Sequence, residues 1–286
     1  MRHLVALATL GLGACAGPLS ALQHRTSFTT EVGRFDIDYA RGGEASAASI
    51  RGAVMRAGPK LAYWGGLREP VAIRVLATHR LLEEAVNRPG YPWLRAWARY
   101  DEVFVQAPRT WTLFGASQAE VDELMLHELT HCVMYQLAAT RTGWTRKEIP
   151  LWFREGMASV TANQEYRWPA LEELARYYEK NPGTDPVGDP ESLYQGQSDI
   201  VYGAAHHTFA FLVRRYGDAA VREVLRRMQE GAAFPEAFEQ SVGLSAQTFI
   251  DDFRRFVRLR GFHQRRRQRV PHPATPVSET TSPSTL

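Results

Sequence analysis

The sequence predicts an α+β fold, with a small mixed β-sheet and helices in the N-terminal half and a mostly helical C-terminal half. Two observations support this fold class. Strand-like and helix-like segments alternate up to Pro108, whereas from Ser117 onward the apolar residues recur almost wholly at helical spacing. The chain has 286 residues, of which 44% are hydrophobic, so it can bury one sizeable core or two small ones.

The N-terminal half contains three candidate strands and two candidate helices. Residues 35–39 alternate between apolar and polar side chains, as in a half-buried strand. Residues 71–76 are almost continuously apolar, which indicates a buried strand, and residues 102–106 form a third strand before Pro108. Apolar residues at helical spacing predict helices at 45–60 and 81–86.

The C-terminal half is predicted to be a series of helices. Residues 117–120 (SQAE) form a capping box, so a helix should begin there and run to about Leu137. A second helix should follow Pro150, because proline suits the first helical turn. Further helices fit residues 168–180, 199–215, 218–230 and 245–260, with Gly217 and Gly243 as natural helix ends.

The N-terminus is typical of an exported protein. Residues 1–14 combine a short basic start with an apolar segment too short to span a bilayer, which predicts a cleaved signal peptide. The sequence Leu12-Gly13-Ala14-Cys15 resembles the lipobox of bacterial lipoproteins, in which the cysteine carries the lipid. We therefore expect a membrane anchor through Cys15 at the bacterial cell envelope, on the outer membrane facing the periplasm or the outside. The alternative is an ordinary export signal with an incidental cysteine.

The folded domain is expected between two terminal segments. Residues 15–30 are polar and small and should form a tether, and residues 31–262 should form the domain. Residues 263–286 begin with an arginine cluster (Arg265–Arg269) and continue rich in Pro, Ser and Thr, so we expect them to be disordered. The cluster is either a solvated helix end or a site for anionic lipid, glycan or nucleic acid. The net charge of only +3 gives no further indication of nucleic acid, and none is expected as a partner.

The two cysteines of the chain indicate a fold without disulfides. If Cys15 carries lipid, Cys132 has no partner. We expect Cys132 to be a small buried apolar residue, since it lies one position round the helix from the metal site described next.

Residues 127–131 (HELTH) carry the pattern of a metal site. On a helix, positions i and i+4 share one face, so His127 and His131 can bind the same ion. Glu128 is rotated by about 100° and can reach a water molecule on that ion rather than the ion itself. Apolar residues surround the motif, and burial makes a histidine pair without a ligand costly. The motif therefore predicts a zinc site.

The third ligand must come from elsewhere in the chain, since a catalytic zinc takes three protein ligands and leaves one position open. A third histidine of the metzincin kind is excluded, because the required positions hold Met134 and Leu137. Glu155, in the next predicted helix, is the candidate ligand, and Glu148 is its rival in the preceding loop. Gly156 is unfavourable in a helix, which suggests a close approach of two backbones beside Glu155.

The combination of HELTH with residues 152–158 (WFREGMA) resembles the gluzincin zinc metallopeptidases, in particular the peptidase MA-like group. The resemblance covers roughly residues 34–262 and implies a zincin-like fold with the zinc cleft between its two halves. It also implies one catalytic Zn²⁺ bound by His127, His131 and Glu155, and a protein or peptide substrate. Many gluzincins have an acidic residue four positions after the ligand glutamate. Ser159 stands there, which leaves the partner of the zinc-binding histidines open.

This resemblance also points to further catalytic residues within residues 198–207. Tyr202 matches the tyrosine that stabilises the oxyanion, and its alternative role is packing. His206 lies one helical turn later and is the second candidate, or an orienting neighbour. We expect His207 to face solvent. Residues 102–107 are the expected edge of the sheet, where an extended substrate backbone could pair.

Together these residues predict hydrolysis of peptide bonds. Zinc lowers the pKa of a bound water towards about 7, and Glu128 can accept its proton and pass it to the leaving amine. The chain has no Gly-x-Met-Glu-Asn-like segment before the metal helix, which is typical of related aminopeptidases, so we expect an endopeptidase. The alternative is a catalytically silent zinc-binding scaffold or recognition lipoprotein of the same fold.

Overall fold

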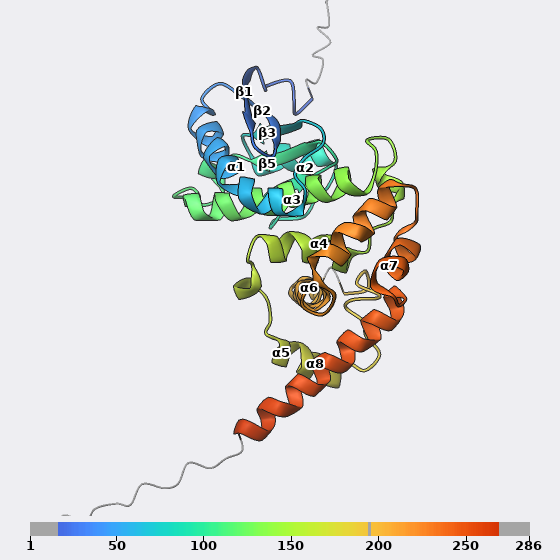
Figure 1. Ribbon diagram of the computed structural model, residues 1–286. Helices are drawn as coiled ribbons and strands as arrows, with labels where there is room; N and C mark the ends of the chain where they lie inside the picture. Colours follow the sequence, from blue (N-terminus) through green and yellow to red (C-terminus); the bar gives the residue numbers. More distant parts are fainter. Residues whose placement is uncertain (1–16, 194–195, 269–286) are drawn as a thin grey trace, which may run out of the picture.

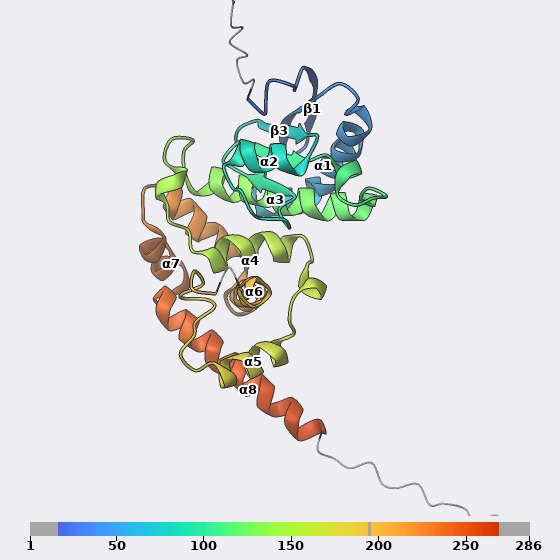
Figure 2. The same ribbon diagram turned by 180° about the vertical axis from the view of Figure 1, so that it is seen from behind.

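The computed structural model describes residues 17–193 and 196–268, and it has the predicted α+β architecture. Figure 1 shows its two parts stacked on one another, with the sheet and the first helices above and the remaining helices below. Figure 2 shows the same arrangement from behind. The sheet-containing part comes from the N-terminal half of the chain and the helical part from the C-terminal half, as the sequence pattern predicts.

In the described part of the chain, a five-stranded mixed sheet forms the N-terminal half. Its strands are β1 (His24–Thr30), β2 (Gly33–Tyr39), β3 (Val71–Leu76), β4 (Ala96–Ala98) and β5 (Glu102–Gln106), in the order β1-β2-β3-β5-β4. The three central strands run parallel, and β1 and β4 are antiparallel to their neighbours. Side chains of β5 alternate between two cores, with Val103 and Val105 on one face and Phe104 on the other.

The edges of this sheet correct two expectations. Residues 102–106 form a strand, but that strand is not the edge, because β5 lies between β3 and the three-residue strand β4. At the other edge, residues 24–30 form β1 and pair with β2, although they were expected within the tether. None of the side chains of β1 is buried, so this strand lacks the apolar pattern by which sequence reasoning recognises a strand.

Helices cover both faces of the sheet. On one face, α1 (Glu44–Trp64) packs against α3 (Gln118–Ala138), and on the other face α2 (His79–Val86) packs its apolar side on Phe104. Figure 2 brings α2 to the front of the sheet. Helix α3 begins at the predicted capping box, in which the Glu120 carboxylate accepts a hydrogen bond of 2.8 Å from the Ser117 backbone N–H.

Among the described residues, five α-helices form the C-terminal part: α4 (Leu151–Thr161), α5 (Leu171–Lys180), α6 (Ser198–Gln229), α7 (Phe234–Val242) and α8 (Ala246–Gln268). Two predicted helix ends are confirmed, since Gly217 interrupts α6 with φ 82° and Gly243 ends α7 with φ 84°. Trp152 of α4 is fully buried among Phe234, Phe238 and Phe249, which makes α4 the centre of this core. The connections include the short 3-10 helices η1 (Pro108–Thr110), η2 (Trp144–Arg146) and η3 (Glu165–Arg167).

The predicted terminal segments lie only partly within the described residues. Helix α8 continues to Gln268, so it extends beyond residue 262, where the folded domain was expected to end. Residues 265–267 of the arginine cluster belong to this helix, and Arg269 lies outside the described residues. The signal segment 1–14 and Cys15 also lie outside them. Within residues 17–193 and 196–268, no helix is both long enough and apolar enough to cross a bilayer.

Candidate metal centre

Helix α3 carries His127 and His131 on one face, at the boundary between the two parts of the chain. The centroids of the two imidazole rings are 5.0 Å apart, and both side chains are largely shielded from solvent. The helix is fixed in place by apolar side chains that are buried in the main core: Val121, Met125, Leu129 and Val133. Burial of this side of α3 determines which face carries the histidines.

Glu155 reaches the histidines from α4. Its Oε2 atom lies 3.6 Å from His127 Nε2 and 3.5 Å from His131 Nε2. The next residue, Gly156, allows α4 to lie directly against α6, because a Cβ atom there would be 2.5 Å from the backbone oxygen of Ala205. The close approach expected at Gly156 therefore exists, and it places the neighbouring carboxylate beside the two imidazoles.

These three side chains fit a zinc ion. Each offers one ligand atom, and the three atoms lie within 4.8 Å of one another. Tetrahedral zinc with ligands about 2.0–2.1 Å away separates its ligand atoms by about 3.3 Å, which is close to the distances of 3.5 and 3.6 Å observed here. Two imidazoles and one carboxylate are also a donor set of catalytic zinc sites. Glu148, the rival ligand, lies in the loop before α4 and is not part of this cluster.

The charges of the cluster favour an ionised ligand carboxylate. Burial would raise the pKa of Glu155, but His131 and His127 beside it hold that pKa well below its usual range. For His127, burial opposes protonation, yet the carboxylates of Glu155 and Glu128 raise its pKa. Metal ligands must be deprotonated, so Glu155 is ready to bind an ion, whereas the raised pKa of His127 makes metal binding compete with protonation of this ring.

Side chains behind the histidines orient them. The amide of Gln164 donates to the Glu123 carboxylate at 2.9 Å, which turns its Oε1 towards His127 Nδ1, also at 2.9 Å. Because an amide oxygen only accepts, His127 carries its proton on Nδ1 and leaves Nε2 for a metal ion. His131 is held differently, with the Tyr135 ring stacked on its own at a centroid distance of 6.0 Å. Among the described residues, His131 Nδ1 is buried without a hydrogen-bond partner.

Glu128 lies beside the ligand cluster and the edge of the sheet. Glu128 is 7% exposed, and the backbone of Ala98 in β4 lies close to its carboxylate. Burial raises the pKa of Glu128, and the nearby imidazoles of His127 and His131 oppose this shift. A carboxylate with a raised pKa is a better proton acceptor near neutral pH. The strand next to the site is thus β4 rather than residues 102–107.

Helix α6 carries both candidates for stabilising an oxyanion. His206 is 5% exposed, and its Nδ1 lies 2.8 Å from Ser159 Oγ, which also accepts a hydrogen bond of 2.8 Å from Trp168 Nε1. In either imidazole tautomer, this bond to Ser159 fixes the orientation of the His206 ring. Burial lowers the pKa of His206 to about 4, so its ring is neutral at pH 7.

Tyr202 lies between two tryptophans near the ligand cluster. Its ring stacks on Trp168 at a centroid distance of 5.5 Å and meets the edge of Trp93 at 6.5 Å. Its phenol is close enough to the guanidinium of Arg154 to affect the pKa of that group electrostatically. Arg154 in turn forms an ion pair of 3.4 Å with the Glu155 carboxylate. The Tyr202 ring is therefore packed against two tryptophans and also lies near the arginine that pairs with Glu155.

The surroundings of these side chains revise two expectations. His207 does not face solvent, because it is 7% exposed and its Nε2 is hydrogen-bonded to the backbone oxygen of Pro169 at 2.8 Å. Ser159, which stands where many gluzincins have an acidic residue, contacts His206 rather than a metal-binding histidine. The partner left open by the sequence is Gln164, which bonds to His127.

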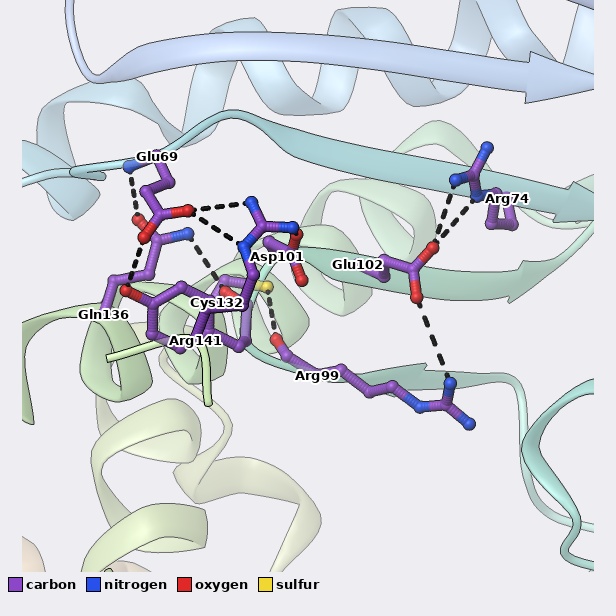
Figure 3. Close-up of polar contacts among 9 residues, drawn as sticks. Glu69, Arg74, Arg99, Asp101, Glu102, Cys132, Gln136 and Arg141 are labelled. Carbon is purple, nitrogen blue, oxygen red and sulfur yellow. Dashed lines mark hydrogen bonds and ion pairs between the residues drawn. The ribbon is translucent and has the colours of Figure 1, made fainter. Parts of the chain in front are cut away.

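The reverse side of α3 holds the edge of the sheet in place (Figure 3). The Cys132 thiol donates to the backbone oxygen of Arg99 at 3.2 Å, and the Gln136 amide donates to that of Tyr100 at 3.0 Å. The Gln136 oxygen accepts from the backbone N–H groups of residues 68 and 69. Residues 99 and 100 directly follow β4, so these bonds fix the metal helix relative to the edge strand. Cys132 is buried, as expected.

An ion-pair cluster ties the loop after α3 to the same part of the sheet. Arg141 pairs with Glu69 at 2.7 Å and also with Asp101, as Figure 3 shows. Tyr100 donates to the same Glu69 carboxylate at 2.9 Å, and burial is the main reason that its pKa rises to about 12. The cluster supports the strand ends from which β3 and β5 begin.

A comparison with protein families identifies the fold. A family model described as the Peptidase MA superfamily matches residues 67–259, more than half of the chain. The chain belongs to the Peptidase MA superfamily. The match begins just before β3 and includes α3, α4 and α6, which carry all the candidate site residues. Peptidases of this superfamily typically use zinc, which agrees with the donor set at His127, His131 and Glu155. A search of the curated proteins found no matching sequence.

Several members of this site were missed by sequence reasoning. Gln164, Trp168 and Ala98 lie on loops and on a three-residue strand, where neither motif nor periodicity marks them. The contact of Tyr135 with His131 is predictable from the sequence, because Tyr135 lies four positions later and therefore on the same helical face. Arg154 lies within the WFREGMA segment, but nothing in that motif predicts its ion pair with Glu155.

Proposed function

We propose that this superfamily member is a zinc-dependent peptidase of the gluzincin type, with His127, His131 and Glu155 as the zinc ligands. The observation that carries this proposal is the convergence of two imidazole Nε2 atoms and one carboxylate oxygen within 4.8 Å, beside the buried Glu128. The family match over residues 67–259 supports it independently. A protein or peptide is the corresponding substrate.

Glu128 would be the general base of this reaction. A zinc ion in the site would act as a Lewis acid on a water molecule and on the substrate carbonyl. Glu128 would accept a proton from that water and pass it to the leaving amine. The pKa of Glu128 is raised by burial, which favours both transfers near neutral pH.

Tyr202 and His206 are the proposed donors to the developing oxyanion. The His206 ring is neutral at pH 7 and is oriented by its bond to Ser159, and Tyr202 lies near Arg154, which pairs with Glu155. Removing one such donor costs about 10²–10³ in kcat. We expect either Tyr202→Phe or His206→Gln to show this loss with little change in KM, and the variant that shows it identifies the donor. If both variants keep full activity, neither residue stabilises the oxyanion.

The edge strand β4 supports an endopeptidase. Arg95 and Arg99 form the backbone bonds to β5, so the intervening Ala96 and Ala98 direct their N–H and C=O groups away from β5. Within the described residues no other strand pairs with that side. An extended peptide could add there as a further strand and continue past the zinc site in both directions.

The cell-envelope location is part of the same proposal. The lipobox-like Leu12-Gly13-Ala14-Cys15 supports a bacterial lipoprotein that is anchored through lipidated Cys15, at the outer membrane facing the periplasm or the outside. We expect Cys15→Ala to abolish incorporation of labelled palmitate and to move the protein into the soluble fraction. Membrane fractionation that is unchanged in Cys15→Ala would contradict the anchor.

The central experiment compares the full chain with Glu128→Gln. Metal analysis should give one zinc per chain for both proteins, while cleavage of casein or quenched-fluorescence peptides should occur only in the former. Glu239→Gln, an exposed glutamate on α7, is the matched control and should retain full activity. Stoichiometric zinc without any cleavage would favour the silent scaffold or recognition lipoprotein. Absence of bound metal in the wild-type protein would contradict both.

A further inference from the structure

A cavity of about 340 Å³ adjoins the candidate metal centre. It lies between the segment that leads into β4 and the start of α4, which supplies Leu151 and Arg154. Arg154 forms the ion pair with Glu155, and Trp93, another lining residue, contacts the Tyr202 ring at a centroid distance of 6.5 Å. The cavity is thus adjacent to a candidate zinc ligand and to a candidate oxyanion donor.

Five of the eight residues that line this cavity are aromatic or aliphatic. Trp97 and Trp93 line it, and Trp93 meets the edge of Tyr91 at a centroid distance of 5.5 Å. Leu94 and Leu151 complete the apolar surface. Aromatic walls favour another ring through edge-to-face and offset-stacked contacts, in addition to the burial of apolar area. A space of this size and lining suits a large apolar side chain.

The charged groups of the cavity discriminate between substrates. Two arginines, Arg88 and Arg154, and one glutamate, Glu191, line it. The Arg88 guanidinium is stacked 4.9 Å above the Trp97 ring, so a positive charge lies directly on the aromatic wall. A lysine or arginine side chain that entered this space would meet like charges, which is a repulsive contribution to specificity.

We propose that this cavity is the specificity pocket of the site and accepts a bulky uncharged apolar side chain of the peptide, aromatic above all, while it rejects lysine and arginine. This inference rests on the proposed peptidase function, because it assigns the cavity to a residue next to the scissile bond. It narrows the substrate class from peptides in general to peptides with an aromatic or large aliphatic residue at one position beside that bond.

A binding experiment tests the pocket without any catalysis. The full chain is labelled with 5-fluorotryptophan, and Trp93→Phe and Trp97→Phe assign two of its seven tryptophan resonances. N-acetyl-phenylalaninamide should shift both resonances saturably, and N-acetyl-alaninamide and N-acetyl-lysinamide should bind about tenfold more weakly or less. Arg88→Glu should reduce the discrimination against the lysinamide. The proposed pocket would be contradicted if the resonances stayed unchanged with the phenylalaninamide or responded equally to all three compounds.

A cleavage experiment tests the assignment to the substrate. Sites cut in denatured casein are mapped by mass spectrometry, and matched peptides with Phe, Leu, Ala or Lys at the preferred position are then compared. We expect kcat/KM to be at least about tenfold higher for Phe than for Ala or Lys, and Trp97→Ala to bring the Phe-to-Ala ratio close to one. Phe114→Ala truncates a 94% exposed ring outside the cavity and should leave the ratio unchanged.

The two experiments separate the pocket from the peptidase activity itself. Cleavage without preference for a large apolar residue, together with unshifted tryptophan resonances, would overturn the pocket and leave the proposed function intact. Binding of the phenylalaninamide without cleavage of any peptide would contradict the proposed function, while the cavity would stand as an aromatic binding site.

Discussion

His127 Nδ1 lies 2.9 Å from the side-chain oxygen of Gln164, a residue 37 positions later in the chain. Gln164 is held in one orientation because its amide donates to the Glu123 carboxylate, which can only accept. The bond fixes the proton of His127 on Nδ1 and directs Nε2 towards Glu155. Partners of this kind determine how well a histidine is oriented for a metal ion.

We predict that Gln164→Ala lowers the zinc affinity by roughly 10–100-fold, because His127 loses the acceptor that sets its tautomer. Competition with a chromophoric chelator measures this change. The double variant Glu123→Gln with Gln164→Glu exchanges the two groups and keeps an oxygen opposite His127, so it should recover most of the affinity. An affinity that is unchanged in Gln164→Ala would show that the pair does not support the metal site.

Gly156 is predicted to be irreplaceable even by alanine. A Cβ atom at this position would lie 2.5 Å from the Ala205 backbone oxygen and from Phe209 Cβ, neither of which is a flexible side-chain end. Gly156→Ala should therefore lower the free energy of unfolding by about 1–3 kcal/mol and weaken zinc binding by moving Glu155. Urea denaturation and chelator competition measure the two effects.

The matched control is Gly52→Ala in α1. A Cβ atom there would come no closer than 3.1 Å to the guanidinium end of Arg56, which can move aside. This substitution should raise the free energy of unfolding by about 0.5–1 kcal/mol, since alanine is the better helix former. If both substitutions had the same effect, close packing between α4 and α6 would not be the reason for Gly156.

The parts of this fold that the sequence predicts are those with long, periodic patterns. The capping box at residues 117–120 begins α3, and Gly217 and Gly243 interrupt or end helices as expected. The three candidate ligand side chains also come together, because two of them share a helical face and the third lies beside the glycine of a close helix contact. In each case the position of the residue follows from the geometry of the helix to which it belongs or which it ends.

The parts that the sequence does not reveal depend on contacts between distant segments. The edge strand β4 has three residues, too few for a recognisable alternation, so the sequence pattern wrongly predicts β5 as the edge. Strand β1 buries no side chain, and its only signal is the backbone pairing with β2. His207 is buried and hydrogen-bonded to the backbone oxygen of Pro169, 38 positions earlier, a contact that no helical spacing encodes.

Gln136 is predicted to be a major determinant of stability. It is fully buried, and its amide serves three backbone groups, at residues 68, 69 and 100. Gln136→Ala leaves these groups without their partner, so we expect the free energy of unfolding to fall by at least about 2 kcal/mol. Gln247→Ala, at an exposed position of α8, should change it by no more than about 0.5 kcal/mol. A similarly small change in Gln136→Ala would contradict this role.

His206 is predicted to make the stability of the protein fall in mild acid. Burial lowers its pKa in the folded state to about 4, from the ordinary value of 6.5, so below about pH 6.5 the unfolded chain binds a proton that the folded chain does not. The neutral, buried ring therefore makes its full contribution to the free energy of unfolding above about pH 6.5. As the pH falls towards about 4, the free energy of unfolding decreases by up to about 3 kcal/mol. Urea denaturation at pH about 7.5 and about 5 measures the free energy of unfolding of the wild type and of His206→Gln. The wild type should lose more stability over this interval than the variant, and equal losses would mean that His206 does not stay neutral in the folded protein.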